Sequence, residues 1–353
     1  MRRDGLDHNI ERRQFMKYAG TTATVALTGL AGCAGSDDNS GGSGGNGGNN
    51  GFPENDLRYI IPFSEGGGTD TYARQIIPAM DEEFESSIAV ENIPGAASLR
   101  GTGELFYADP DGHTYGGFNP PSTPVSAMVN PPDFDMQQLK GVGSYARTPF
   151  IIVANPQHGI ENFEDLKGRY DSGELGTFGG KERGGVDHVL ALLMKNNEEY
   201  AFGWDRYVGY DGSGPAVQAT VSGEIPAAIS TDTAAQAAVQ GGRVDTVVGL
   251  SSEGTQVFPD LQSVVDEGYP NIDYLGQLRR GMFVPPETPD GPIQELTSTL
   301  ETALQKQSVQ EWSENTGNVV EYGGPETAEE AVTDAFNNIP DQVDLEQVRQ
   351  ETG

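Results

Sequence analysis

Three consecutive glycines, Gly66, Gly67 and Gly68, followed by Thr69 and Asp70, form the pattern that most clearly predicts a chemical task. They come directly after an apolar, strand-forming run, and an apolar helical periodicity begins after them. A glycine-rich turn between a strand and a helix leaves several backbone N–H groups without intramolecular partners, at the positive end of the helix dipole. Such a turn favours the binding of a carboxylate-sized anion. The alternative is that the glycines only allow the chain to turn tightly.

Other candidate binding positions lie at comparable places in the sequence. A second glycine-rich turn, at residues 179–185, precedes another apolar helical periodicity, and His188 starts that helix. The alternative role of this histidine is a capping or interdomain hydrogen bond. Polar residues also follow two predicted strands, at 119–124 and at 231–233. Ligands collect at the carboxyl ends of strands in open α/β sheets, so these exits are candidate ligand contacts.

No pattern typical of a catalytic centre occurs in the folded part of the sequence. After residue 55 the chain contains neither an HExxH metal motif, nor a GxSxG nucleophile elbow, nor the spaced glycines of a GxGxxG dinucleotide turn. Cys33 is the only cysteine, which excludes internal disulfides and cysteine-rich metal sites. We therefore expect no catalytic residue, no metal and no cofactor.

The 353-residue chain is strongly acidic, with 53 Asp and Glu against 21 Lys and Arg and a formal net charge of −32. Because nucleic acid is itself an anion, this excess argues against it as a partner. The excess indicates a surface that stays hydrated in concentrated salt; the alternative is ordinary acidic solubility. In molar salt the Debye length is only about 3 Å, so the net charge does not prevent local donors from binding an anion.

Residues 1–33 resemble an export signal. Arg12 and Arg13 begin a twin-arginine motif, and the mildly apolar run that follows is too short to span a bilayer permanently. The run ends in Leu-Ala-Gly before Cys33, which resembles the lipobox of lipoproteins. We therefore expect cleavage before Cys33 and attachment to the extracytoplasmic face of the cell membrane through a lipid on this cysteine. The alternative is an accidental arginine pair and a structural cysteine.

The rest of the chain is predicted to be a flexible tether followed by a folded part. Residues 34–55 are predicted to be flexible, because Gly, Ser, Asn and Asp dominate them. The folded part then alternates strands and helices in two series, with a connecting strand and hinge expected at 150–154. Near the C-terminus we expect a strand at 319–322 and a fraying acidic tail. Small-residue turns from both series that meet across a cleft are the architecture of a solute receptor.

Several motifs in register resemble the substrate-binding receptors of tripartite tricarboxylate transporters, the Bug-type family, from about Leu57 to Val320. They are IIPF and GGGTD between 60 and 70, VENIPGA at 90–96, DPDGHT at 109–114, YDGSGPA at 210–216, and FPDL and EGYP between 258 and 270. The resemblance implies an α/β, two-lobed, periplasmic-binding-protein-like fold of type II. Each lobe would be a mixed sheet flanked by helices, with a ligand cleft between the lobes. We place lobe 1 at residues 56–154 and 276–353, and lobe 2 at residues 155–275.

In that family, two glycine turns grip one carboxylate, largely through main-chain donors and bridging waters. By position, the resemblance implies ligand contacts from the first turn at Ser64, Gly66, Gly67, Gly68, Thr69 and Asp70. The second turn would contribute Gly184, Gly185, Asp187 and His188. The strand exits would contribute Ser122, Thr123, Thr231 and Asp232.

Three features depart from the family's pattern. Glu65 stands where a small residue or proline is usual, and the second turn reads GKERGGVDH instead of a serine-rich sequence. Before Gly281, where the family commonly has an aromatic residue, this chain has arginine. We hypothesise that Arg279 or Arg280 enters the cleft and pairs bidentately with a second carboxylate of the ligand. The alternative is that the arginine only balances the charge of acidic residues near it.

The sequence therefore predicts a non-catalytic, lipid-anchored, extracytoplasmic receptor for a small organic carboxylate of the di- or tricarboxylate class. The resemblance implies that it passes this acid to the membrane permease subunits of a tripartite tricarboxylate transporter. One alternative is a secreted α/β enzyme that acts on an anionic small molecule. Another is a surface partner of a sensor.

Overall fold

The computed structural model describes residues 52–352, which fall within one compact unit. The predicted signal at residues 1–33, with Cys33, lies outside the described residues, as does nearly all of the predicted tether at 34–55. Among the described residues, no helix has both the length and the apolar character needed to cross a membrane.

Strands and helices alternate along the chain, as the sequence predicts. The strands are β1 (Leu57–Ile61), β2 (Ile88–Asn92), β3 (Thr114–Phe118), β4 (Lys140–Ala154), β5 (Thr177–Lys181), β6 (Arg206–Tyr210), β7 (Ala227–Thr231), β8 (Asp245–Gly249) and β9 (Gln277–Val284). The helices are α1 (Gly68–Asp81), α2 (Leu99–Phe106), α3 (Ser122–Val129), α4 (Phe163–Asp171), α5 (Val186–Asn196), α6 (Ser213–Ser222), α7 (Asp232–Gln240), α8 (Asp273–Gly276), α9 (Asp290–Gln305), α10 (Gln307–Thr316), α11 (Pro325–Gln342) and α12 (Leu345–Thr352).

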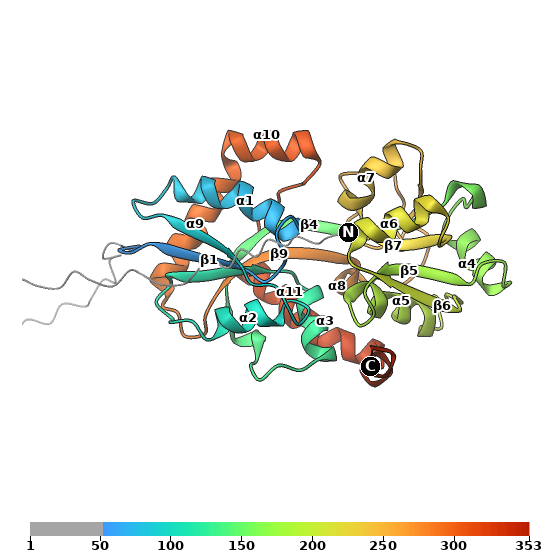
Figure 1. Cartoon of the computed structure of the whole chain (residues 1–353), viewed down its shortest axis with the longest axis horizontal. Helices are drawn as coiled ribbons and strands as arrows, with labels where there is room; N and C mark the ends of the chain where they lie inside the picture. The colour runs from blue at the N-terminus through green and yellow to red at the C-terminus, as the bar shows by residue number, and fades with distance from the viewer. Residues whose placement is uncertain (1–51, 353) are drawn as a thin grey trace, which may run out of the picture. The chain divides into compact units, whose positions relative to one another are not determined.

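The elements form two lobes (Figure 1). The strand order is β2-β1-β3-β9-β4-β7-β5-β6, with β8 also paired to β4. In lobe 1, β1 pairs in parallel with β2 and β3, and β9 runs antiparallel to β3 and to the first part of β4. In lobe 2, β5 pairs in parallel with β6 and β7, and the end of β4 runs antiparallel to β7 and β8. Each lobe is a mixed sheet flanked by helices, which confirms the predicted fold class.

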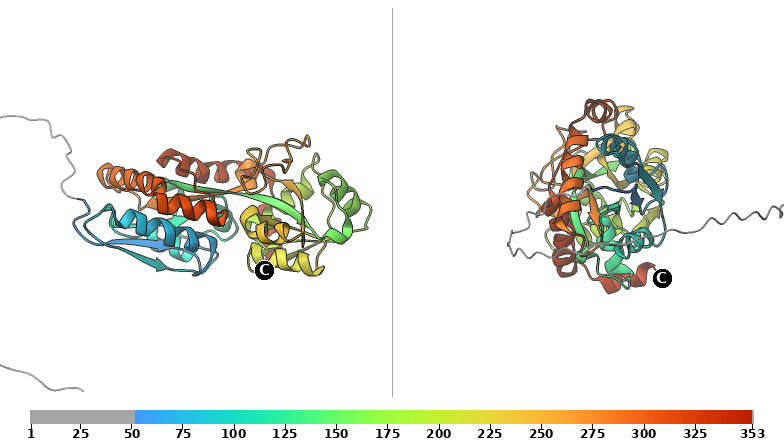
Figure 2. Two further views of the ribbon diagram at one scale, coloured as in Figure 1. Left: turned by 90° about the horizontal axis from the view of Figure 1, so that it is seen from above. Right: turned by 90° about the vertical axis from the view of Figure 1, so that its left-hand side faces the viewer.

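The strand β4 is shared by the two lobes. Its residues 140–149 pair with β9, and its residues 150–154 pair with β7 and β8. The sequence predicts a separate short strand at 150–154, but pairing on both sides extends it to 15 residues. Figure 2 shows this strand running from one lobe into the other. The strands β4 and β9 are therefore the connections about which the lobes can turn.

Apolar side chains at helical spacing fix α1 against its sheet. Tyr72, Ile76 and Met80 are each at most 1% exposed and belong to the core of lobe 1, as their four-residue spacing predicts. This burial positions the N-terminus of α1, and with it the glycine turn.

Two expectations for the C-terminal region are wrong. Residues 319–322 form no strand; the structure has only an isolated bridge between Gly323 and Ser144 of β4. The acidic tail forms α12 instead of fraying. Val343 and Val348 are buried in an apolar cluster, and Arg349 donates to the main-chain oxygen of Val129 at 3.2 Å. Buried apolar residues spaced along an acidic segment hold it in place.

Candidate functional site

The first glycine turn leaves helix α1 without a side-chain cap. Gly66 has φ +76° and donates its N–H to Oδ2 of Asp70 at 2.9 Å. Gly67, the residue before the helix, has no side chain to cap it. Within residues 52–352, the N–H groups of Gly68, Thr69 and Asp70 have no hydrogen-bond acceptor. These amides remain available to an anion at the positive end of the helix dipole.

The carboxylate of Asp70 supports this turn from behind. It is buried and accepts hydrogen bonds from Gly66, from Nε of Arg74 at 2.8 Å and from Nδ2 of Asn92 at 3.0 Å. Burial acts to raise the pKa of Asp70, but the hydrogen bonds from Arg74, Gly66 and Asn92 outweigh it and lower the pKa below its ordinary value. Asp70, a predicted ligand contact, does not line the pocket described next.

A pocket of about 650 Å³ lies between the two lobes, where the fold class predicts a cleft. Eight of the predicted ligand-binding residues line it: Ser64, Gly66, Gly67, Gly68, Thr69, Ser122, Thr231 and Arg280. Asn119 of the predicted strand exit and Lys181 and Glu182 of the second predicted turn also line it. The structure adds Asp211, Gly212, Ser213 and Gly214, which were not predicted as ligand contacts. The volume is within the range of small-molecule sites.

The guanidinium of Arg280 forms one wall of this pocket. The residue is only 6% exposed, and its Cζ lies 5.0 Å from the ring centre of Tyr72. Its Nη1 donates to Oγ1 of Thr69 at 2.9 Å, and a Cβ on Gly68 would come within 2.8 Å of Nη2. Among residues 52–352 no carboxylate lies within 4 Å of Arg280, and its Nε has no hydrogen-bond partner. A buried cation with no carboxylate in contact favours an anion beside it.

The hydroxyl of Thr69 is oriented by its two neighbours. Its Oγ1 accepts one hydrogen bond from Arg280 and another from Nδ2 of Asn119, at 2.7 Å. A hydroxyl oxygen has two lone pairs, so its own hydrogen is left to donate to a third group. Thr69 therefore presents a donor beside the unused amides of α1.

A second helix starts at the opposite wall of the pocket. Gly212, with φ +102°, precedes α6, and within the described residues the N–H groups of Ser213 and Gly214 have no acceptor. Lys181, at the end of β5, lines the same wall and has no carboxylate within 4 Å among the described residues. Glu182 also lines the pocket but is exposed to solvent. Each lobe thus brings a helix N-terminus to the pocket.

The glycines that end the second predicted turn do not line this pocket, although Lys181 and Glu182 of the same turn do. Gly184 and Gly185 border a neighbouring pocket of about 460 Å³, which shares Glu182 with the first. The N–H of Gly184 donates to Nδ1 of His188 at 3.1 Å, as Gly66 does to Asp70, so Nδ1 carries no proton. Asp187 is buried, accepts from the N–H of Lys181 at 3.0 Å and has its pKa raised to about 6 by burial. Asp187 and His188 support the turn.

Two other predicted contacts, Thr123 and Asp232, are buried beside lining residues. Thr123 accepts a hydrogen bond from Ser98 at 3.1 Å. Asp232 accepts from Oγ1 of Thr255 at 2.6 Å. Burial raises the pKa of Asp232 to about 6, although hydrogen bonds from Thr255 and Thr233 and the positive charges of Arg147 and Arg280 act to lower it.

The missed turn at residues 211–215 carries a signal that the sequence contains. Its letters DGSGP precede a helix, just as GGG precedes α1. Glycines directly before an apolar helical periodicity were therefore sufficient to predict this turn as a candidate ligand contact. Lys181 lies within the second predicted turn, but its side chain had no signal of its own, because a lysine at the end of a strand is usually only a solvated side chain.

Comparisons with known proteins agree with this fold. A family model described as "Tripartite tricarboxylate transporter family receptor" matches residues 72–338. A UPF0065 protein of Bordetella pertussis is 27% identical over 274 residues, covering 75% of this chain and 81% of that protein. A solved structure described as a periplasmic transporter is 25% identical, with a TM-score of 0.68 over 82% of this chain and 96% of that one. A TctC solute binding protein from Polaromonas, 17% identical, shares the fold with a TM-score of 0.70 over 82% of this chain and 98% of that one.

The family match covers well over half of the chain and includes α1 from Tyr72 onward, the strands of both lobes that follow it, and Arg280. The protein therefore belongs to the tripartite tricarboxylate transporter receptor family, as its motifs predict.

Proposed function

We propose that this protein is an extracytoplasmic receptor that binds, without turnover, a small organic acid of the di- or tricarboxylate class. It delivers this acid to the membrane permease of a tripartite tricarboxylate transporter. One observation carries the proposal: the buried guanidinium of Arg280 has no carboxylate partner among the described residues and lies beside the unused amides of α1.

The first carboxylate binds at the N-terminus of α1. The amides of Gly68 and Thr69, the Thr69 hydroxyl and the Arg280 guanidinium all lie at this wall of the pocket. Charge-assisted hydrogen bonds are stronger than neutral ones, and low exposure strengthens them further. From the sequence, Arg279 or Arg280 was expected to pair with a second carboxylate, but the contact of Arg280 with Thr69 supports a role for Arg280 beside the glycine turn.

The second carboxylate binds at the N-terminus of α6. There Ser213 and Gly214 offer amides, and Lys181 offers a positive charge. Glu182 and Asp211 lie on the same wall, but both are exposed, so molar salt screens their repulsion. Anion-binding groups on two facing walls support a ligand with at least two carboxylates.

Export and anchoring rest on the signal and lipobox at residues 1–33. Replacing the acceptor cysteine, Cys33→Ser, is expected to move the protein from the membrane fraction to the soluble fraction, whereas Ser36→Ala leaves it with the membranes. Cell fractionation with immunoblotting measures this. Retention of the Cys33→Ser protein in the membrane fraction would remove the lipid anchor from the proposal.

A thermal-shift screen in molar salt tests the ligand class. A ligand present at 100 times its Kd stabilises the folded state by about 2.7 kcal/mol. Succinate, malate or citrate is expected to raise the unfolding midpoint, whereas acetate and butyrate at equal ionic strength leave it nearly unchanged. Equal responses to mono- and dicarboxylates, or no response to any of these acids, would contradict the proposed class.

A further inference from the structure

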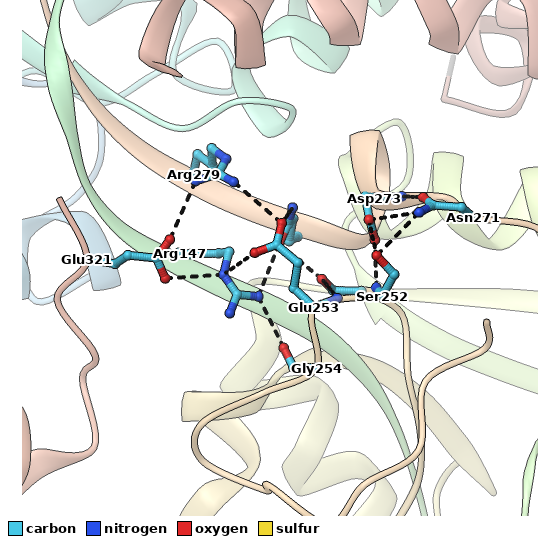
Figure 3. Close-up of polar contacts among 10 residues, drawn as sticks. Arg147, Ser252, Glu253, Gly254, Asn271, Asp273, Arg279 and Glu321 are labelled. Atoms are coloured by element: carbon cyan, nitrogen blue, oxygen red, sulfur yellow. Dashed lines mark hydrogen bonds and ion pairs between the residues drawn. The ribbon is translucent and has the colours of Figure 1, made fainter. Parts of the chain in front are cut away.

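Four charged side chains meet on the face of β9 that points away from the ligand pocket (Figure 3). Side chains alternate along a strand, so Arg280 lines the ligand pocket while Arg279 lines a smaller pocket of about 250 Å³ on the other face. Arg279 lies directly opposite Arg147 of β4, at the place where both strands pass between the lobes. Two arginines therefore face each other at the hinge.

Two glutamates complete a ring with these arginines. Glu253 lies 3.4 Å from Nε of Arg147 and 3.6 Å from Nη2 of Arg279. Glu321 lies 3.4 Å from Nε of Arg147 and 3.8 Å from Nη1 of Arg279. Like charges directly opposite on neighbouring strands repel, and each glutamate offsets this repulsion by contacting both arginines. The Arg147 side chain is only 8% exposed, so solvent screens its contacts less than those of a surface ion pair.

The two glutamates are anchored in different lobes. Glu253 lies in the loop after β8, where the N–H of Ser252 donates to Oδ1 of Asp273 at 2.7 Å. Glu321 donates its own N–H to the main-chain oxygen of Tyr145, in the part of β4 that belongs to lobe 1. Both arginines lie on the lobe 1 part of the hinge strands, as does the anchor of Glu321, so the two contacts of Glu253 are the ones that join the lobes. A rotation of lobe 2 relative to lobe 1 separates Glu253 from the two arginines, whereas Glu321 keeps them in place on lobe 1.

We propose that Arg147, Arg279, Glu253 and Glu321 form a hinge lock, which holds the two lobes at the angle seen here. Because the ligand pocket lies between the lobes, the lock opposes opening of the pocket and slows the dissociation of a bound acid. This second consequence rests on the proposed receptor function, whereas the lobe angle itself does not.

Distances between spin labels on the two lobes test the lock without any ligand. The labels are attached through Gln218→Cys on α6 and Gln305→Cys on α9, two exposed positions, in a full-length chain that carries Cys33→Ser. Glu253→Gln is expected to broaden the distance distribution and shift it away from that of the parent protein. Glu198→Gln, which removes an exposed charge from lobe 2, is expected to leave the distribution unchanged.

The same spin-label measurement is repeated with a variant of the glutamate in lobe 1, and the dissociation of a ligand is then measured. Glu321→Gln, with Glu314→Gln of α10 as its matched control, is expected to change the distribution less than Glu253→Gln, because Glu321 lies in the same lobe as both arginines. In the Glu253→Gln variant, the dissociation rate of succinate is expected to rise about fivefold. An unchanged distance distribution in the Glu253→Gln protein would overturn the lock. Altered distributions in a protein that binds no carboxylate would support the lock and overturn the receptor proposal instead.

Discussion

Replacing Arg280 by glutamine is expected to weaken the binding of the preferred dicarboxylate by roughly a hundredfold, or about 3 kcal/mol. The guanidinium is 6% exposed and supplies a positive charge beside the amides of α1. Glutamine keeps a hydrogen-bond donor but removes that charge, so the carboxylate is desolvated without compensation. Isothermal titration calorimetry in molar salt measures the affinity, and circular dichroism checks that the variant folds.

Two further variants separate the effects of the binding groups. Lys181→Gln is expected to weaken dicarboxylate binding about tenfold while leaving the weak binding of a matched monocarboxylate unchanged. Arg206→Gln removes an exposed arginine of β6 and serves as the control with near-wild-type affinity. An Arg280→Gln protein that binds within threefold of the wild type would show that this arginine does not contact the ligand.

Replacing Asp232 by asparagine is expected to stabilise the protein at pH 8 by up to roughly 3 kcal/mol. Burial raises the pKa of this carboxyl to about 6, against an ordinary value of 3.8. Between these two values the folded state keeps a proton that the unfolded chain has released, so folding stability falls as the pH rises through this window. Above pH 6 the destabilisation is constant, and asparagine avoids it.

Urea denaturation between pH 4 and pH 8 measures this effect. Asp187, whose pKa burial also raises to about 6, contributes a slope of the same sign, so Asp232→Asn should reduce this fall in stability without abolishing it. Asp260→Asn replaces an exposed aspartate of the same lobe and is the matched control. A variant no more stable than the wild type at pH 8 would mean that Asp232 does not carry a buried charge in the folded protein.

The local pattern of apolar and polar residues was sufficient to predict most of the fold. The four-residue spacing of Tyr72, Ile76 and Met80 predicts a helix with one buried face, and α1 has that face. The length of β4 could not be predicted in this way, because it depends on pairing with β9, β7 and β8 at once. The tail was mispredicted for a related reason: the burial of Val348 depends on a core contributed by distant segments.

The binding site was only partly predictable. Glycines before a helix mark an unused N-terminus, but which of three such termini faces the cleft depends on how each helix packs on its sheet. The turns at Gly68 and Gly214 line the pocket, whereas the turn at Gly185 lines the neighbouring one. The sequence also did not show which of the two arginines, Arg279 or Arg280, enters the cleft. Only the register of β9 against β4 directs Arg279 to the hinge and Arg280 to the pocket.

Amide shifts of protein labelled with 15N-glycine, recorded by NMR while the acid with the largest thermal shift is titrated, locate the bound carboxylates directly. We predict large, saturable shifts for the amides of Gly68 and Gly214, with small changes at Gly184 and Gly185. The opposite pattern, with shifts centred on Gly184 and Gly185 and none at Gly68, would contradict a carboxylate site built from the α1 N-terminus and Arg280.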